Sequence, residues 1–130
     1  MSVNDITGVI VDVALQIHKD LGPGLLESVY EAVLAKKLEQ QKLKLERQKV
    51  LQFEYEGIVF DEGFRMDLLV EGQVIVELKS VEQLVSVHKK QLLTYVKLAR
   101  KPAGLLLNFG AALLKDGICR IINAPEASLR

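Results

Sequence analysis

The chain has 130 residues, of which 49% are hydrophobic and 26% are charged, and its 17 basic and 17 acidic side chains give a net charge of about zero. The length predicts one domain over residues 1–130, and the composition is ordinary for a soluble globular protein. The balanced charge disfavours strong non-specific nucleic-acid binding, which usually needs a basic surplus.

Two helices are predicted in the first 40 residues. Apolar residues from Ile6 to Ile17 recur at spacings of three and four, which indicates an amphipathic helix over about residues 4–20. The sequence GPG at 22–24 ends it, and a second helix follows. Its buried side is expected to carry Leu26, Val29, Tyr30, Val33, Leu34 and Leu38.

Nothing near the N-terminus predicts export or membrane insertion. The basic region and cleavage site of a signal peptide are absent, and the apolar run GVIVDVAL is short and broken by Asp12. Cys119, the only cysteine, excludes an internal disulfide and is expected to act as a small hydrophobe in the last strand. These features predict a soluble, cytoplasmic protein with no membrane partner.

Three strands are predicted in the middle of the chain. In VLQFEYEG, Leu51, Phe53 and Tyr55 alternate with polar residues, as in a half-buried strand. FRMDLLV and VIVELKS are two further predicted strands, joined by the tight loop EGQ. Together they indicate an antiparallel meander.

The last third of the chain predicts a helix and more strands. Residues 82–100 return to a helical period, with Leu84, His88, Gln91, Leu92, Tyr95 and Ala99 near one face. KPAG ends this helix, GLLLNF reads as a buried strand, and LKDGICRIIN as a hairpin ending in an edge strand. The order predicts an α/β domain in which the helix returns the chain parallel to the strand of residues 74–79.

The loop EGQ decides which charges share a face of the sheet. If all three residues form the loop, Val70 pairs with Val74 and Asp67 lies opposite Glu77, with Cβ atoms about 4.5–5.5 Å apart. One face of the first strand would then carry Phe64, Met66, Leu68 and Val70, and the other Arg65, Asp67 and Leu69. A two-residue loop would separate the two carboxylates. We favour three residues because every charge of both strands then gathers on one side.

Asp67, Glu77 and Lys79 together indicate a metal site. Two carboxylates at this separation raise each other's pKa unless a cation lies between them. Mg²⁺ prefers carboxylate and carbonyl oxygens in a partly hydrated shell, where it can polarise a phosphoryl oxygen and activate water. Lys79 would orient or deprotonate that water. The alternative is a structural cluster of ion pairs, because such networks also perturb pKa values.

The spacing D-x9-E-x-K on two neighbouring strands resembles the PD-(D/E)XK nuclease superfamily, with Met66 where the superfamily's name has Pro. GLLESVY at 24–30 resembles the G-x-x-E-x-x-Y motif of the small GxxExxY family, which is assigned to that superfamily. QLLTY at 91–95 is similar to the Q-x-x-x-Y helix motif of the RecB-like branch. The resemblance covers about residues 6–123. It implies a nuclease-like core: a mixed central sheet with a three-stranded antiparallel meander, flanking helices and a parallel strand after a helical crossover.

The resemblance also implies site residues and a reaction. The metal ligands would be Asp67, Glu77, the backbone carbonyl of Leu78 and Glu27, which would bind the metal or its water. Lys79 would position the attacking water, while Gln91 and Tyr95 would contact substrate phosphate or brace Lys79. The implied reaction is Mg²⁺-dependent (or Mn²⁺-dependent) phosphodiester hydrolysis, with nucleic acid as partner and DNA favoured over RNA.

Several alternatives remain open on the residues alone. The chain could be a non-catalytic module that binds nucleic acid or protein on the same fold, or could hydrolyse a small phosphate ester. Glu27 could simply favour the helix dipole, and Gln91 and Tyr95 could form a buried hydrogen-bonded pair. Tyr30 is expected in the core, and His88 outside the site. A homodimer is considered because GLLLNF and CRIIN could present an open sheet edge.

Overall fold

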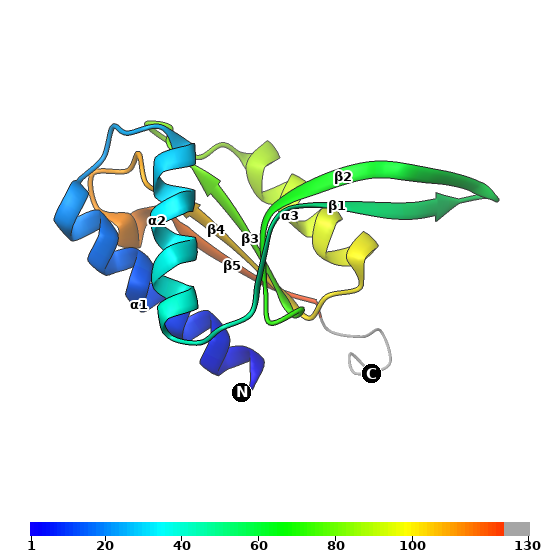
Figure 1. The fold of residues 1–130 in the computed structure, drawn as a ribbon. Helices are drawn as coiled ribbons and strands as arrows, with labels where there is room; N and C mark the ends of the chain where they lie inside the picture. The colour runs from blue at the N-terminus through cyan, green and yellow to red at the C-terminus, as the bar shows by residue number, and fades with distance from the viewer. Residues whose placement is uncertain (124–130) are drawn as a thin grey trace, which may run out of the picture.

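The computed structural model describes residues 1–123. Its elements, shown in Figure 1, are α1 (Val3–Leu21), α2 (Glu27–Gln40), β1 (Leu45–Tyr55), β2 (Ile58–Val70), β3 (Val74–Lys79), α3 (Ser86–Ala99), β4 (Ala103–Asn108), the 3-10 helix η1 (Leu114–Gly117) and β5 (Ile118–Ile122). The strands form a five-stranded sheet in the order β1-β2-β3-β4-β5. β3 and β4 are parallel and the other neighbours antiparallel. The predicted mixed α/β fold, with its meander and parallel return, is confirmed.

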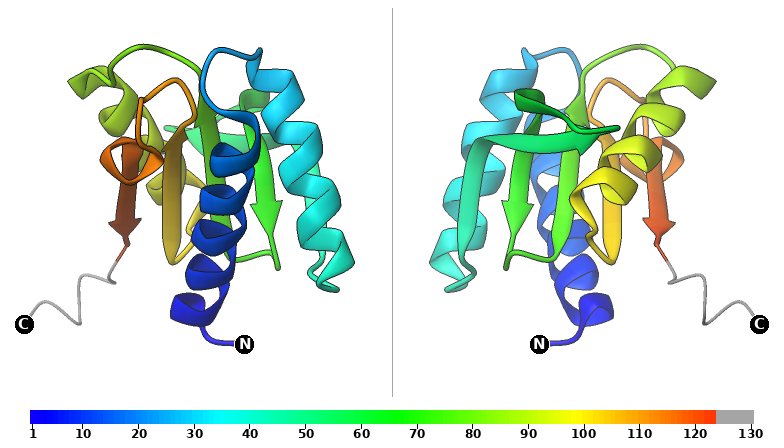
Figure 2. Two further views of the ribbon diagram at one scale, coloured as in Figure 1. Left: turned by 90° about the vertical axis from the view of Figure 1, so that its left-hand side faces the viewer. Right: turned by 90° about the vertical axis from the view of Figure 1, so that its right-hand side faces the viewer.

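Helices cover both faces of the sheet, α1 and α2 on one and α3 on the other (Figure 2). The larger apolar cluster fills the space between the sheet and the first two helices and includes Ile6, Ile10, Leu34, Leu68, Val76 and Leu107. The smaller cluster lies under α3 and contains Met66, Leu69, Ile75, Leu92, Val96 and Leu106. None of the helices in residues 1–123 is long and apolar enough to cross a membrane.

Tyr30 holds the turn between the first two helices. Its hydroxyl donates to the carbonyl of Gly22 at 2.5 Å and accepts from the N–H of Leu25 at 3.2 Å. Its fully buried ring stacks on Phe109, with centroids 4.4 Å apart. The core position predicted for Tyr30 is confirmed, and the tyrosine also fixes the turn from which α2 begins.

The buried side of α2 differs from the prediction at its start. Leu26 and Val29 are exposed, because the helix begins at Glu27 and its first turn extends past the core. Glu31 and Ala35 are buried instead, beside Tyr30. The predicted buried side of α2 is therefore wrong for Leu26 and Val29 and correct for Tyr30, Leu34 and Leu38.

The first two strands are longer than predicted and leave the body of the protein. β1 begins at Leu45 and β2 at Ile58, and their joined ends project beyond the helices as a hairpin (Figure 1). We call residues 50–65 the arm. Tyr55, expected to be half-buried, is exposed because it lies near the tip, where the body offers nothing to cover it.

The alternation of side chains along β2 breaks at Asp67. Leu68 packs on the α1 and α2 side, but Met66 belongs to the cluster under α3, and Phe64 packs against that cluster. The strand pairing of β1 with β2 skips Asp67 and Gln48, whose φ of 50° lies in the left-handed region. The predicted common face for Phe64, Met66, Leu68 and Val70 is therefore wrong, because the strands change face at this irregularity.

The remaining elements correct two further predictions. α3 begins at Ser86 rather than at residue 82, and the Nδ1 atom of His88 accepts from the N–H of Val85 at 3.1 Å, just before the helix. β5 is an edge strand as predicted, but β4 lies between β3 and β5 and offers no edge.

The Tyr30→Phe variant tests the role of the hydroxyl group in the turn. Removing it leaves the Gly22 carbonyl and the Leu25 N–H without their partner, so we expect the free energy of unfolding to fall by about 1–3 kcal/mol. Urea denaturation measures this change. Tyr55→Phe is the control: its exposed hydroxyl should change stability by less than about 0.5 kcal/mol. Equal effects of the two variants would contradict the role of Tyr30.

Candidate active site

The loop between β2 and β3 has the three-residue register that we favoured. Val70 pairs with Val74, Leu69 with Ile75, and Leu68 with Val76. Glu71 and Gly72 both adopt positive φ, and the N–H of Gln73 donates to the carbonyl of Val70 at 3.0 Å. This register brings Asp67 and Glu77 together across the two strands.

The regular pairing of β2 with β3 ends at Leu68 and Val76. Beyond it, the carboxylates of Asp67 and Glu77 join the two strands by hydrogen bonds to the backbone. The N–H of Asp67 donates to Oε2 of Glu77 at 2.8 Å, and the N–H of Leu78 donates to Oδ2 of Asp67 at 2.9 Å. Each carboxylate therefore has one oxygen fixed by the backbone of the other strand. The interruption of the strand pairing allows both carboxylates to lie between β2 and β3.

The environment of Glu77 strongly disfavours its charged form. Its side chain is only 8% exposed, and burial, followed by the negative charge of Asp67, raises its pKa to about 8. The positive charge of Lys79 acts in the opposite direction but has the weakest influence on this pKa. Without a bound cation, Glu77 therefore stays largely protonated at neutral pH, because nearby side chains do not offset its burial and the charge of Asp67.

The donor chemistry of this pair fits a hard divalent cation. Oxygens not used by the backbone remain on both carboxylates, and a cation would offset the burial and the Asp67 charge that together raise the Glu77 pKa. Within residues 1–123, no group of three His, Cys, Asp or Glu side chains comes together as a metal cage. Mg²⁺ is a cation that keeps several waters and takes only one or two protein carboxylates, so two carboxylates are enough for its protein ligands.

Glu27 lies apart from the carboxylate pair. It is exposed in the first turn of α2 and lines a cavity of about 480 Å³ with Ser80 and Val81, which follow Lys79 in the chain. The hydroxyl of Ser80 donates to the carbonyl of Leu25 at 2.6 Å, which ties this end of β3 to the turn before α2. Glu27 thus faces the end of β3, and its predicted role as a ligand remains a prediction.

Gln91 and Tyr95 of α3 lie on the side of the sheet that carries the carboxylate pair. Nε2 of Gln91 donates to the Tyr95 hydroxyl at 3.1 Å, and the pair is more exposed than the buried arrangement considered from sequence. The pKa of Tyr95 is raised, first by burial and then by the charges of Glu77 and Asp67. The tyrosine is therefore close enough to sense both carboxylates.

Sequence reasoning missed a polar network behind Asp67. Glu31 of α2 is buried and accepts from the guanidinium of Arg47 and from Gln48. Nε2 of Gln48 also lies 3.5 Å from Oδ1 of Asp67, so the irregular residue of β1 connects Glu31 to the site. The sequence feature that could have indicated this network is Glu31, an acidic residue one helical turn after Glu27 and next to Tyr30, which was expected in the core.

Asn108 is a second polar residue that the sequence analysis did not single out. It pairs with Lys79 across the parallel strands, is 1% exposed, and accepts at Oδ1 from the N–H groups of Val81 and Gly110. It fixes the loops that leave β3 and β4 beside Lys79. The sequence feature that could have indicated this role is the position of Asn108, directly after the apolar run GLLL of a predicted buried strand.

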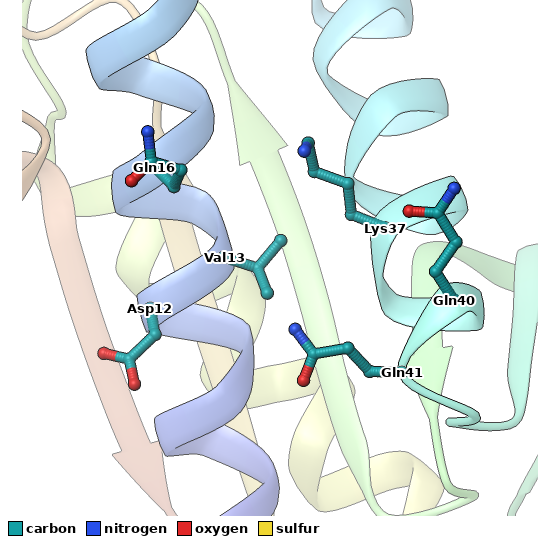
Figure 3. A pocket seen from close by; sticks show the side chains of 6 residues that line it. All are labelled: Asp12, Val13, Gln16, Lys37, Gln40 and Gln41. Atoms are coloured by element: carbon teal, nitrogen blue, oxygen red, sulfur yellow. The ribbon is translucent and has the colours of Figure 1, made fainter.

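The groove between α1 and α2 is separate from this site. It encloses about 290 Å³; Val13 of α1, Lys37 of α2 and Gln41, just after α2, reach into it (Figure 3). It lies on the opposite face of the sheet from α3, so it has no part in the chemistry of Asp67 and Glu77.

Comparison with known proteins gives one match. The family model described as the PD-(D/E)XK nuclease superfamily matches residues 4–121. No curated protein and no solved structure matches the chain. The match does not distinguish the GxxExxY family or the RecB-like branch, so both assignments remain predictions.

The raised pKa of Glu77 predicts that stability depends on pH when no metal is bound. The folded state favours the protonated carboxyl, so this contribution is complete below about pH 4.5 and is lost as the pH rises through about 8. We expect the free energy of unfolding, measured by urea denaturation with a chelator, to fall across this range. Glu77→Gln should flatten the dependence, because its amide stays neutral. A wild-type profile with the same slope as the variant would contradict this account.

Proposed function

We propose that this chain, which belongs to the PD-(D/E)XK nuclease superfamily, is a divalent-metal-dependent nuclease that hydrolyses phosphodiester bonds. The observation that carries the proposal is the carboxylate pair, in which Asp67 and Glu77 are each fixed by a backbone N–H of the neighbouring strand. A bound cation would offset the burial and the Asp67 charge that disfavour ionised Glu77, which gives the pair a function that accounts for its electrostatic cost.

Each site residue takes a distinct role in this proposal. Asp67, Glu77 and the Leu78 carbonyl are the groups that would hold Mg²⁺ or Mn²⁺. The metal, when bound, supplies Lewis acidity and lowers the pKa of a coordinated water. Lys79 orients the attacking water and stabilises the negative charge that develops on the phosphoryl oxygens. Glu27, across the end of β3, would accept a hydrogen bond from a water of the metal's shell.

α3 provides the side of the site that receives the substrate. Gln91 is exposed and hydrogen-bonded to Tyr95, whose hydroxyl lies in the field of both carboxylates. These two side chains contact a phosphate of the substrate.

We further infer that the chain belongs to the GxxExxY family on the RecB-like branch, and that DNA is preferred to RNA.

Replacement of Lys79 and Asp67 tests catalysis. We expect Lys79→Ala and Asp67→Asn each to reduce the rate of cleavage by on the order of 10²–10³-fold, because each loses a group that stabilises the transition state. The measurement is cleavage of labelled single- and double-stranded DNA and RNA with Mn²⁺. Lys36→Ala, an exposed change on α2, is the matched control and should cleave as wild type does. Full activity in both site variants would refute the nuclease proposal.

Calorimetric titration with Mn²⁺ tests the metal site without any choice of substrate. We expect saturable binding by the wild type and its loss in Asp67→Asn, because one free carboxylate cannot balance the ion's desolvation. Lys79→Ala should still bind, since it removes no ligand. Equal binding by the wild type and Asp67→Asn would place the metal elsewhere. Oligonucleotide binding without metal binding or cleavage would favour the non-catalytic module.

A further inference from the structure

The arm presents an apolar surface that the body of the protein does not cover. In its strand pairing, Phe53 lies opposite Phe60 and Tyr55 opposite Ile58, while Leu51 pairs with Phe64 beyond the irregularity at residues 61–63. One face of the hairpin therefore carries only apolar residues: Leu51, Phe53, Tyr55, Ile58, Phe60 and Phe64. Tyr55, Ile58 and Phe60 are between 42% and 63% exposed.

The aromatic rings of this face are ordered with respect to one another and to α3. The rings of Phe53 and Phe60 stack with centroids 5.0 Å apart, and Phe64 stacks on Tyr95 with centroids 4.5 Å apart. Phe53 also lies over Gly63, where any Cβ atom would collide with its ring. The apolar face thus begins on α3 and extends outward along the arm. An isolated two-stranded hairpin is at best marginally stable in water, and an exposed apolar patch of this kind indicates a partner.

The charges of the arm limit what that partner can be. Between residues 50 and 65 the chain carries Glu54, Glu56, Asp61 and Glu62 but only one basic residue, Arg65. A phosphate backbone would be repelled by this excess of carboxylates, and the stacked rings turn their faces to each other rather than to bases. Glu54 lies on the strand face opposite Phe53 and Tyr55, but a two-stranded ribbon is thin compared with a Debye length of about 8 Å, so its charge still acts on a surface that covers the apolar face. The arm therefore suits a surface that is both apolar and basic.

The outer side of α3 has these two properties. Residues 86–101 contain no acidic residue and five basic ones: Lys89, Lys90, Lys97, Arg100 and Lys101. Val87 and Leu98 are exposed, and positions 87, 90, 94, 97 and 98 lie together on the helix side that faces away from the buried Leu92 and Val96. In the part of the chain that the structure describes, none of the charges of the arm or of α3 forms an ion pair.

The two surfaces also match in length. From Val87 to Leu98 the helix rises about 16 Å, and the arm from residue 51 to residue 55 extends about 13 Å. We propose that two copies of this chain associate about a twofold axis, with the apolar face of each arm lying on the exposed side of α3 of the other copy. Such an exchange is self-complementary: one arrangement makes both contacts and leaves no further surface of the same kind to extend the assembly.

This proposal goes beyond the nuclease function and does not depend on it. The interface uses neither Asp67 nor Glu77, so Asp67→Asn should associate like the wild type even if it neither binds metal nor cleaves. The two proposals can therefore fail separately.

Sedimentation equilibrium of the full chain, with paired charge reversals, tests the exchange. We expect the wild type to form a dimer. The arm variant Glu54→Lys with Glu62→Lys, and the α3 variant Lys90→Glu with Lys97→Glu, should each weaken self-association several-fold at low salt, because each places like charges on the two sides of the contact, and the loss should diminish as salt is added. Mixed together, the two variants should form a heterodimer of wild-type strength, because both of its contacts then join opposite charges. All four positions are exposed, so each variant is expected to fold.

One control variant and three contrary results complete the test. Lys19→Glu with Lys36→Glu changes the same charge on exposed positions of α1 and α2 and should leave the dimer unchanged. A wild type that remains monomeric at all concentrations overturns the proposal. So does a dimer that persists in both charge variants, or a failure of the mixed variants to associate.

Discussion

Two carboxyl groups held together between neighbouring strands are the constraint around which this molecule is arranged. Asp67 and Glu77 occupy the place where β2 and β3 would otherwise continue their pairing, and each depends on a backbone N–H of the opposite strand. Replacing regular sheet bonds by these contacts and burying Glu77 both cost stability. The rest of the fold keeps the pair in place: the apolar clusters anchor the strands on both sides, and Asn108 secures the loops beside Lys79.

Three separate parts of the fold hold the site residues in place. From above the sheet, α3 contributes Gln91 and Tyr95, whose ring rests on Phe64 of the arm. At the edge, Gln48 of β1 joins Asp67 to the buried Glu31 of α2. At the end of β3, Ser80 joins the turn that Tyr30 fixes before Glu27. The catalytic groups proposed here therefore come from separate segments of the chain that only the complete fold brings together.

Most of the fold could be predicted from the sequence, because apolar periodicity and turn residues determine it locally. The three-residue register at EGQ was inferred correctly because it alone gathers the charges of both strands. The sheet face of Phe64 and Met66 could not be inferred from the sequence. Strict alternation assumes a regular strand, and it does not predict the positive φ of Gln48 on the neighbouring strand. Glu31 was overlooked for a related reason: its burial is compensated by Arg47 and Gln48, which lie in a different element.

The arm also has a consequence for how the chain folds. Its two strands are adjacent in sequence and can pair from their own turn, whereas the parallel β3–β4 pairing must wait for α3 to cross over. A nascent chain would then display the apolar face of the hairpin early, when unpaired strands readily join those of other chains. Glu54, Glu56, Asp61 and Glu62 interrupt this stretch with like charges, the arrangement that keeps an unavoidable apolar strand from aggregating. The acidity of the arm thus protects the chain during synthesis, before any partner surface has formed.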